Sequence, residues 1–309
     1  MKLSIVSTLY NSAHNITEFY QRVCKACSAC ELNEFEIIFV HDGSPDDSLN
    51  AALLLHEQDS KVVVVDLSRN FGHHRAMMTG LKYATGELVF LIDSDLEERP
   101  EWLIEFKSIF DASACDAVYG VLHARRGGWF ERTTGNFYYK LFNIFSGLEL
   151  PQIATARLMS RRFVNALLSH KETEVIIGGL MHITGFAQIP YPVNKVRIGK
   201  SNYTINKKID LLVDSVVSFS SAPLVSIFYV GITITTLSFL AITYVLIRWV
   251  LSSQSLSGWT SLFLSVWLLG GLLISFLGVI AIYLAKIFIE IKNRPQAIVR
   301  ALYRFKGPN

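Results

Sequence analysis

The stretch LVFLIDSDLE, residues 88–97, decides the fold of this chain. Its five apolar residues in succession are typical of a strand that is buried on both faces of a sheet. The strand in this stretch is predicted to span Glu87–Ile92, and four further candidates are Leu3–Thr8, Glu36–His41, Val62–Leu67 and Ala117–Leu122. The segments between them carry apolar residues at helical spacing. This alternation predicts an α/β fold with a mostly parallel sheet covered by helices on both faces, an architecture that binds nucleotides at the carboxyl ends of its strands.

Local signals mark the starts of several elements. Ser44-Pro45-Asp46-Asp47 combines an N-cap residue, a proline for the first helical position and two acids, which predicts a helix directly after the second strand. Ser160 is predicted to cap a helix that runs through Leu168. Beyond that helix, Phe186–Pro192 has the pattern of a strand.

The composition excludes several classes of protein. Of the 309 residues 51% are apolar, the net charge is +3 and the mean hydropathy is +0.34. These values exclude a disordered chain, a collagen and a disulfide-rich miniprotein, and so small a net charge is no argument for binding nucleic acid. Cys24, Cys27 and Cys30 share one side of a helix expected from about residue 15 to 30, so we interpret them as packing residues. The adjacent pair His73-His74 has no third ligand at zinc-like spacing.

Two long segments near the C-terminus lack charged residues. Only Arg248 is charged between Ser215 and Ala285, so each run exceeds the roughly 20 residues that cross a bilayer. We therefore predict two transmembrane helices, near 223–247 and 261–285, in preference to a buried helical hairpin in a soluble domain. The preceding segment, 205–222, mixes apolar and charged residues and predicts an amphipathic helix at the membrane surface, with an ordinary domain-closing helix as the alternative.

Lysine and arginine residues lie outside the linker that joins the two predicted spans. The linker, Leu251–Thr260, contains neither, whereas both outer flanks are basic. The positive-inside rule then predicts that both termini and the large N-terminal part are cytoplasmic. The predicted organisation is a cytosolic catalytic domain (1–204), a juxtamembrane helix (205–222), a two-helix hairpin (223–285) and a basic cytoplasmic tail (286–309). The expected location of this multi-pass protein is the inner, or plasma, membrane.

Three acidic residues follow the strand of the opening stretch. Asp93, Asp95 and Glu97 come directly after it, with Ser94 between the first two. Carboxylate oxygens are the ligands that Mg²⁺ and Mn²⁺ prefer, and such ions usually bridge to substrate phosphates. A solvated acidic turn is the alternative for this motif taken alone.

Polar residues also follow the three neighbouring predicted strands. Thr8, Tyr10 and Asn11 come at the end of the first, and the second is followed by Asp42-Gly43. The third is followed by the segment 68–72, which adds a cation at Arg69 and a further glycine. A carboxylate at Asp42 suits a base N–H or a ribose hydroxyl, and Gly43 lets the backbone come close. Because the carboxyl ends of parallel strands meet at one edge, these groups predict a nucleotide and metal site there.

Motifs that are individually weak occur in one order over nearly the whole chain. They are RNFG at 69–72, DSDL at 93–96, RLMSR at 157–161, GKSNY at 199–203, SFS at 218–220 with PL at 223–224, and EIKNRP at 290–295. In this order, and with two C-terminal spans, the chain resembles glycosyltransferase family 2 of the GT-A fold. Within that family it resembles the polyprenyl-phosphate glycosyltransferases, the group of dolichol-phosphate mannose synthase and the bactoprenol glucosyltransferases.

The resemblance implies a metal-dependent enzyme that transfers a sugar from a nucleotide sugar to a polyprenyl phosphate at the cytoplasmic face, with inversion at the anomeric carbon. A UDP-sugar and undecaprenyl phosphate are the favoured pair, and Mg²⁺ or Mn²⁺ is the expected cofactor. The lipid-linked product would serve cell-surface polysaccharide synthesis or the O-antigen modification of lipopolysaccharide. The identity of the sugar, the choice between uridine and guanosine, and a homo-oligomeric state stay open.

The resemblance also assigns residues to the site. It implies catalytic roles for Asp93, Asp95 and Arg157; metal binding by Asp93, Asp95 and Glu97; donor binding by Thr8, Tyr10, Asn11, Asp42, Gly43, Arg69, Asp93, Ser94, Arg197 and Lys200; and acceptor-phosphate binding by Arg125, Arg126 and Arg132. Guanidinium groups suit the last role because they pair with phosphate in a bidentate manner. Arg197 and Lys200 lie in a loop that resembles the lid over the diphosphate, and a solvated or lipid-headgroup contact is the alternative for each of these cations.

Three positions depart from the pattern of the family. Thr8 stands in place of a proline, His41 in place of the first aspartate before Asp42, and Thr155 in place of an acidic residue that is often assigned as the catalytic base. A sugar hydroxyl acceptor needs such a base. A phosphate acceptor does not, because its second pKa of about 6 leaves it largely dianionic at pH 7. The departure at Thr155 therefore favours a phosphate acceptor, or an inactive relative.

Two other functions stay open. A catalytically degenerate membrane adaptor that binds a nucleotide sugar without turnover would explain His41 and Thr155. A polysaccharide synthase subunit would share the donor site, but such enzymes usually carry more spans and a Gln-x-x-Arg-Trp element, which this sequence lacks.

Overall fold

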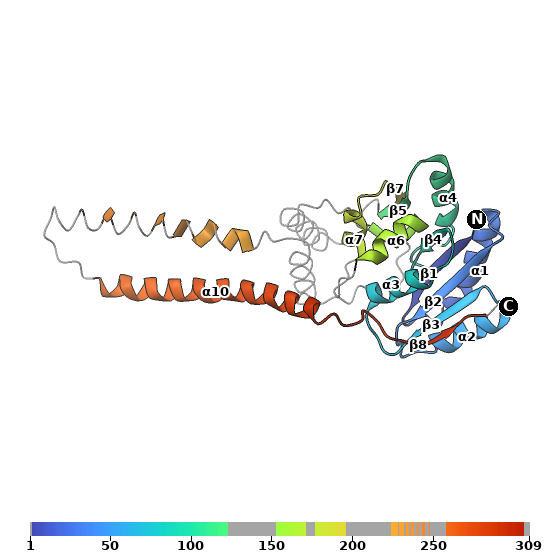
Figure 1. Ribbon diagram of the computed structural model, residues 1–309, viewed down its shortest axis with the longest axis horizontal. Helices are drawn as coiled ribbons and strands as arrows, with labels where there is room; N and C mark the ends of the chain where they lie inside the picture. Colours follow the sequence, from blue (N-terminus) through green and yellow to red (C-terminus); the bar gives the residue numbers. More distant parts are fainter. Residues whose placement is uncertain are drawn as a thin grey trace. The chain divides into compact units, whose positions relative to one another are not determined.

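The computed structural model describes residues 2–122, 153–170, 177–195 and 258–305, together with scattered positions between 224 and 247 (Figure 1). The chain divides into two compact units. One contains residues 1–134, 150–202 and 294–309, and the other contains 135–149 and 203–293. The first unit holds the sheet and every described residue of the predicted site.

An eight-stranded sheet has the order β7-β5-β6-β4-β1-β2-β3-β8. Its strands are β1 (Leu3–Leu9), β2 (Phe35–His41), β3 (Val62–Leu67), β4 (Leu88–Leu91), β5 (Ala117–Leu122), β6 (Ile153–Ser160), β7 (Gln188–Val193) and β8 (Val299–Tyr303). The central strands β4, β1, β2 and β3 are parallel, as are β5 and β7, whereas β6 and β8 run antiparallel to their neighbours. The predicted α/β fold with a mostly parallel sheet is confirmed.

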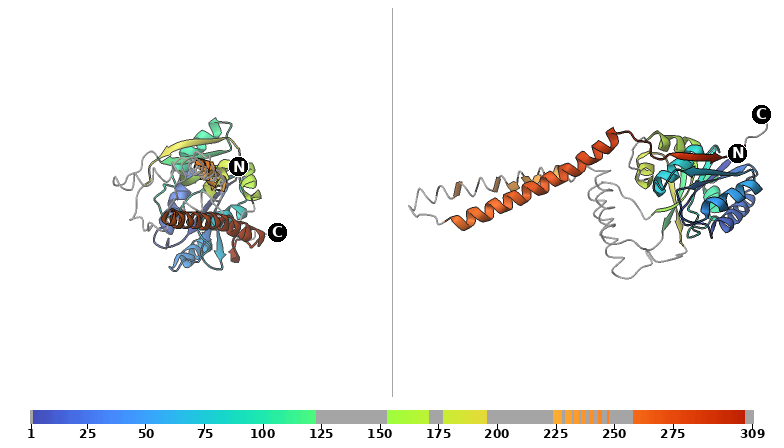
Figure 2. Two further views of the ribbon diagram at one scale, coloured as in Figure 1. Left: turned by 90° about the vertical axis from the view of Figure 1, so that its left-hand side faces the viewer. Right: turned by 90° about the horizontal axis from the view of Figure 1, so that it is seen from below.

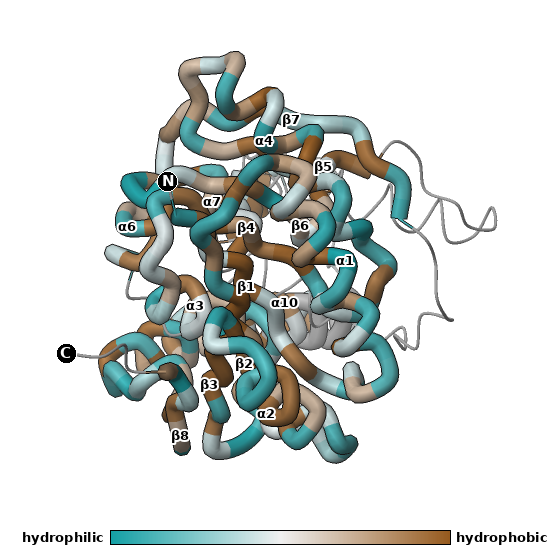
Figure 3. Tube along the Cα trace, turned by 90° about the vertical axis from the view of Figure 1, so that its right-hand side faces the viewer, coloured by the Kyte–Doolittle hydropathy of each residue, from teal (hydrophilic) through white to brown (hydrophobic). Residues whose placement is uncertain are grey.

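Helices cover both faces of this sheet. Those of the first unit are α1 (Ile16–Ala29), α2 (Ser48–Gln58), α3 (His73–Tyr83), α4 (Trp102–Ala112), α6 (Arg161–Ser169) and α7 (Ile177–Ile183). Side chains alternate along each strand, so Ile5 and Phe39 pack with α1, α2 and α4, while Val6 and Val40 pack with α3, α6 and α7. Most residues of the central strands are buried and apolar, as Figure 3 shows for parts of β1 and β2, because both faces of these strands are covered.

One predicted helix start is wrong and another is confirmed. Helix α2 begins at Ser48, four residues after the predicted cap at Ser44. The carboxylate of Asp46 accepts hydrogen bonds from both of these serine hydroxyls and from the amide of Ala13, 2.9 Å away, so 44–47 form a polar turn against the loop after β1. At α6 the prediction holds, since the Ser160 hydroxyl accepts from the Phe163 amide at 3.2 Å.

Helix α10 (Trp259–Ile291) belongs to the second unit. Its segment Leu269–Ile291 has a mean hydropathy of 2.5 and is the one helix among the described residues that is long and apolar enough to cross a membrane. Helix α10 begins two residues before the second predicted span, 261–285, and ends six residues after it. The first predicted span, 223–247, is described only at scattered positions, which are helical. The predicted surface helix at 205–222 lies outside the described residues.

The C-terminal segment is more than the predicted basic tail. After α10 the chain returns to the first unit, where β8 pairs antiparallel with β3 and brings Leu302 opposite Val65 (Figures 1 and 2). The amide of Ser68 extends this pairing by donating to the carbonyl of Ile298 at 2.9 Å. Strands β3 and β8 are far apart in sequence, so their pairing exists only in the folded chain. The short basic segment therefore showed no local sign of a strand.

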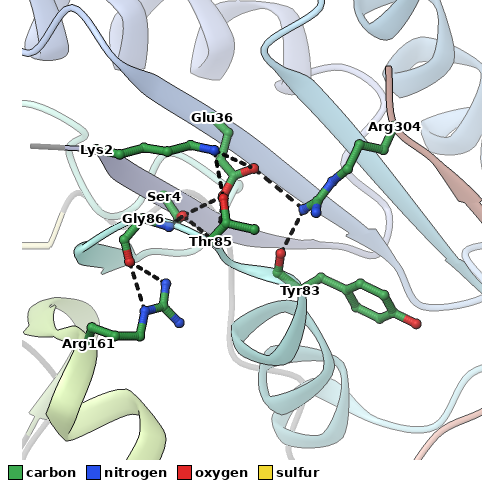
Figure 4. A network of polar contacts seen from close by, with 8 residues as sticks. All are labelled: Lys2, Ser4, Glu36, Tyr83, Thr85, Gly86, Arg161 and Arg304. Carbon is green, nitrogen blue, oxygen red and sulfur yellow. Dashed lines mark hydrogen bonds and ion pairs between the residues drawn. The ribbon is translucent and has the colours of Figure 1, made fainter. Parts of the chain in front are cut away.

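The buried carboxylate of Glu36 links the end of β8 to residues at the amino ends of β1, β2 and β4 (Figure 4). Oε1 of Glu36 accepts from the Ser4 hydroxyl at 2.6 Å and from the amide and hydroxyl of Thr85, each at 2.7 Å. Arg304, the residue after β8, approaches Oε2 at 3.4 Å and donates to the carbonyl of Tyr83 at 2.7 Å. This network lies at the end of the sheet opposite the predicted site.

Candidate functional site

The acidic segment after β4 is fastened to the loop after β1. The buried Ser94 hydroxyl lies 2.8 Å from the Thr8 carbonyl, to which it donates, and 3.0 Å from the Ser12 hydroxyl. The Asn15 side chain donates to the Asp95 carbonyl at 3.1 Å. Ser94 therefore positions this segment rather than facing solvent, and a direct contact with a donor stays a prediction.

Asp93 presents a buried oxygen to the site. His73, the first residue of α3, lies between Thr8 and Asp93, with Nδ1 3.0 Å from the threonine hydroxyl and Nε2 3.3 Å from Oδ1 of Asp93. That Oδ1 atom accepts no hydrogen bond within the described part of the chain. Burial raises the pKa of Asp93, but its neighbours His73 and Lys195 outweigh this and hold the pKa below its ordinary value. Asp93 is therefore an ionised carboxylate that pairs with His73.

Asp95 and Glu97 continue the acidic segment. Asp95 is exposed and accepts a hydrogen bond from the Glu97 amide at 2.9 Å. Burial of its carboxylate and the charge of Asp93 raise the pKa of Asp95. Within the described residues no three His, Cys, Asp or Glu side chains converge as a metal-binding group. Metal binding by Asp93, Asp95 and Glu97 stays a prediction, and the carboxylates of Asp93 and Asp95 suit a magnesium-type site completed by substrate phosphates.

Asp42 holds the loop after β3. Its buried carboxylate accepts from the amide of Phe71 at 2.7 Å and from that of Gly72 at 3.0 Å, one on each oxygen. Burial raises the pKa of Asp42 despite these two donors. Gly43 has φ +58°, and a Cβ there would come within 2.4 Å of the Asn70 amide nitrogen. The geometry gives both residues a role in joining two loops, and the predicted contact of Asp42 with a nucleotide stays a prediction.

His41 is part of the same arrangement. Its Nδ1 is 2.7 Å from Oδ1 of Asp66, and its Nε2 accepts from the Ser44 amide at 3.1 Å. Both ring nitrogens are used, and the side chain is buried. The departure at position 41 is therefore accommodated within the fold.

Three other predicted donor-site residues lie at this edge of the sheet. Tyr10 is exposed over half of its surface (51%), as suits an aromatic ring that stacks on a base. Asn11 has φ +54° and donates its amide to the Ser44 hydroxyl at 2.8 Å. The Arg69 guanidinium lies 4.4 Å from the centre of the Phe71 ring. The structure brings these residues to the same strand ends as Asp42 and Asp93.

A buried ion pair beside the acidic segment was missed by the sequence reasoning. Lys195 Nζ lies 2.8 Å from Oε1 of Glu98, a carboxylate with no exposed surface that also accepts from the Thr155 amide at 2.7 Å. Burial and the charge of Asp93 raise the pKa of Glu98. Burial lowers the pKa of Lys195, but the three nearby acids outweigh it and the net shift is upward. A positive charge is thus held next to Asp93, and only the folding of β6 and β7 could reveal it.

A family model described as "Glycosyl transferase family 2" matches residues 4–168, more than half of the chain. This chain belongs to glycosyltransferase family 2. The match spans β1 to β6 and so includes the acidic segment and the loops around it.

Curated relatives align with nearly the whole glycosyltransferase chain. A protein of Mycobacterium tuberculosis named "Putative glycosyltransferases" is 45% identical over 98% of this chain and 89% of its own length. The "Bactoprenol glucosyl transferase" of Shigella phage SfII is 30% identical over 98% of this chain and 99% of its own length. Glucosyl-3-phosphoglycerate synthase from Mycobacterium tuberculosis, solved with Mn²⁺, UDP and glucosyl-3-phosphoglycerate, is 18% identical, with a TM-score of 0.50 over 72% of this chain and 81% of that one. These findings confirm the family and the GT-A fold.

Arg157 of this glycosyltransferase lies in the interior of the first unit. It is buried on β6 and donates to the carbonyls of Ala154 and Thr155, both at 3.3 Å, and to the sulfur of Met181. Burial lowers the pKa of Arg157 to about 10. This environment gives Arg157 a structural role, and a catalytic one stays a prediction.

The remaining predicted cations lie outside the described residues. They are Arg125, Arg126 and Arg132, assigned to the acceptor phosphate, and Arg197 and Lys200, assigned to the lid over the diphosphate. Their roles stay predictions.

Proposed function

We propose that this family 2 glycosyltransferase moves a sugar from a UDP-sugar to undecaprenyl phosphate, giving a polyprenyl-phosphate sugar with an inverted anomeric carbon. The observation that carries the proposal is the pair of carboxylates Asp93 and Asp95 directly after β4, at the edge where β1, β2 and β3 also end, with Oδ1 of Asp93 buried 3.3 Å from His73 Nε2. The bactoprenol glucosyl transferase that aligns over the whole chain supports the choice of acceptor. The solved structure with UDP and Mn²⁺ is a precedent for the donor in this fold.

Asp93 and Asp95 would hold a divalent cation, Mg²⁺ or Mn²⁺, with Glu97 near by. When bound, such an ion neutralises the charge that develops on a leaving diphosphate. Lys195 adds a positive charge at the same place, since Asp93 and Asp95 both raise its pKa. The predicted lid residues Arg197 and Lys200 follow Lys195 closely in sequence and would also bind the diphosphate.

The surroundings of Thr155 favour a phosphate acceptor. No carboxylate stands at this position, and the adjacent carboxylate of Glu98 has no exposed surface and is engaged by Lys195 and the Thr155 amide. Position 155 itself therefore offers no carboxylate that could take a proton from a sugar hydroxyl. A phosphate dianion needs no such group, because it is already nucleophilic at pH 7.

The reaction is then a single displacement. An oxygen of the acceptor phosphate forms a bond to the anomeric carbon while the bond from that carbon to the nucleoside diphosphate breaks, and the electron pair leaves with the diphosphate. Ser94 and Asn15 keep the acidic segment in place, and Asp42 holds the loop after β3 against the loop after β2. Positioning of the two substrates supplies much of the rate, with Arg125, Arg126 and Arg132 orienting the acceptor phosphate.

The proposed membrane arrangement is based on the long uncharged segments and the basic residues that flank them. Helix α10 supplies one apolar segment of sufficient length, and the uncharged run that precedes it supports a second span at 223–247. The basic flanks support a multi-pass protein of the plasma membrane with a cytosolic catalytic domain. The amphipathic segment 205–222 would bring the lipid phosphate towards the site.

The proposal is tested with the full chain in detergent micelles. Radiolabelled UDP-, GDP- and other nucleotide sugars are incubated with undecaprenyl phosphate, and the lipid extract is resolved. We expect one labelled lipid that forms only with a divalent cation, disappears with EDTA, and is absent with the folded variant Asp95→Ala. A folded wild-type protein that forms no labelled lipid from any donor would overturn the proposal.

A second candidate function is a nucleotide-sugar-binding adaptor without turnover, suggested by Thr155 and His41. In that case UDP-sugars would bind to the protein, but no nucleoside diphosphate would be released when undecaprenyl phosphate is added. The contacts of His41 with Asp66 and Ser44 weaken this alternative, because they preserve the loop that carries Asp42.

A further inference from the structure

Strand β8 contacts the loop of the donor site. This loop, residues 68–72, follows β3 and is called here the donor loop. Arg300 of β8 donates from Nη2 to the Ser68 carbonyl at 2.6 Å, while the Ser68 amide donates to the Ile298 carbonyl at 2.9 Å. Both backbone polar groups of Ser68 are therefore satisfied by the C-terminal segment.

Arg300 also reaches the charged pair beneath this loop. Its Nη1 lies 3.5 Å from Oδ2 of Asp66, whose other oxygen is 2.7 Å from Nδ1 of His41. Asp66 is almost fully buried, so a cation at its open side compensates a carboxylate that has little solvent. His41 in turn accepts from the Ser44 amide. One arginine thus joins β8 to the loops after both β2 and β3.

The two ends of the donor loop are held in different ways. Ser68, at its start, is held by β8, and the amides of Phe71 and Gly72, at its end, are held by Asp42. Gly43 permits the close approach between the two loops, since a Cβ there would overlap Asn70. A loop fixed at one end alone samples more conformations, and ordering it on binding a ligand costs free energy.

We propose that Arg300 is a positioning residue that preorganises the donor loop for the nucleotide sugar, so that the strand following the apolar helix α10 forms part of the donor site. This inference rests on the proposed function for the identity of the ligand. Arg300 lies outside the segment matched by the family model, which ends at residue 168. Arg300 acts through Ser68 and Asp66, and the donor itself is not among its contacts.

The chain offers a matched control in the residue that follows the same strand. Arg304 also carries a guanidinium and also fastens β8, but its contacts are Glu36 and the Tyr83 carbonyl at the opposite end of the sheet (Figure 4). Arg304→Ala therefore loosens β8 without removing a contact to the donor loop. A difference between Arg300→Ala and Arg304→Ala isolates the effect on the loop from general docking of the strand.

The test uses full-length protein in detergent micelles and two measurements. The first is hydrogen–deuterium exchange of the peptide that contains 68–72, which needs no ligand. We expect Arg300→Ala to exchange about fivefold faster there than wild type, as for the loss of one hydrogen bond to a charged donor at a partly exposed site, and Arg304→Ala to exchange at the wild-type rate. The second is the Kd for UDP-glucose with Mn²⁺, with about fivefold weakening expected for Arg300→Ala alone.

Each outcome has a distinct meaning. Unchanged exchange in Arg300→Ala, or an equal increase in Arg304→Ala, would overturn the positioning role. Faster exchange with unchanged affinity for the donor would overturn the link between the loop and the nucleotide site. If the folded wild type bound none of the nucleotide sugars, the proposed function would fail, while the exchange data would still decide whether Arg300 holds the loop.

Discussion

The substitution Glu36→Gln is expected to destabilise the protein without changing sugar transfer. Glu36 is 6% exposed, and its Oε1 accepts three hydrogen bonds from Ser4 and Thr85. Glutamine keeps an acceptor oxygen, so these bonds become neutral. Hydrogen bonds to a charged group contribute about 1.5–3 kcal/mol and neutral ones about 0.5–1.5 kcal/mol, which gives a loss of about 3 kcal/mol for the three. The new amide group would also face Lys2 and Arg304 in place of a carboxylate.

The measurement is guanidinium chloride unfolding of the full chain in detergent micelles, followed by far-ultraviolet circular dichroism. Glu34→Gln is the matched control, because it makes the same chemical change at an exposed position two residues earlier and is expected to cost less than about 0.5 kcal/mol. Transfer activity of Glu36→Gln below its unfolding range should equal that of wild type, since Glu36 lies at the amino ends of the strands. A loss within about 0.5 kcal/mol of the control would refute the reasoning.

The same variant has a defined pH dependence. Burial raises the pKa of Glu36, but hydrogen bonds from Ser4 and Thr85 outweigh it and hold the pKa below its ordinary value. A depressed carboxyl pKa stabilises the folded state above the pKa of the unfolded chain, about 4.3, and this contribution is lost as the pH falls through the folded-state pKa. Wild type and Glu36→Gln should therefore differ most near pH 7 and converge in acid. A gap that stays constant down to pH 3 would contradict this account.

Variants at the predicted site separate catalysis from structure. Thr155→Ala should keep most of the lipid-product formation that Asp95→Ala abolishes, and a folded but inactive Thr155→Ala would contradict the phosphate-nucleophile mechanism. Gly43→Ala places a Cβ 2.4 Å from the Asn70 amide at φ +58°, so we expect a loss of about 2 kcal/mol in unfolding free energy and weaker UDP-glucose binding by calorimetry; wild-type values would count against the close loop contact. The pKa of Asp46 is raised by burial but lowered further by its hydrogen bonds, so Asp46→Asn should remove part of the stability that wild type loses as the pH falls below about 4, seen in thermal midpoints from about pH 5 to about pH 2.

Periodicity in the sequence predicted the central sheet well. Runs such as Val62–Leu67 and Ala117–Leu122 have the predicted limits in the structure, because a strand covered on both faces is apolar at most of its positions. Strand β6 and strand β8 were not predicted. β6 carries the polar residues Thr155 and Arg157, and β8 alternates in only five residues, so neither shows a run that differs from its surroundings.

The candidate site was predicted in part. The acidic segment and the loops after β1, β2 and β3 could be found because polar residues directly after buried strands share one edge of a parallel sheet. His73, Glu98 and Lys195 were missed as site residues because their importance depends on neighbours that are distant in the chain. His73 reaches Thr8, 65 residues away, and Lys195 reaches Glu98 only after β7 has joined the sheet.

The sequence by itself determined the class of the fold, the family and the edge of the sheet at which the chemistry lies, since all three follow from local pattern and short motifs. The tertiary structure alone decided which carboxylates are available. Asp42 uses both oxygens to hold the donor loop and Glu98 uses one oxygen for Lys195, whereas Asp93 lies beside His73 with Asp95 two residues further along the chain. The same chemical group thus has three roles, because the role depends on which backbone amides and cations the fold brings within about 3 Å of it.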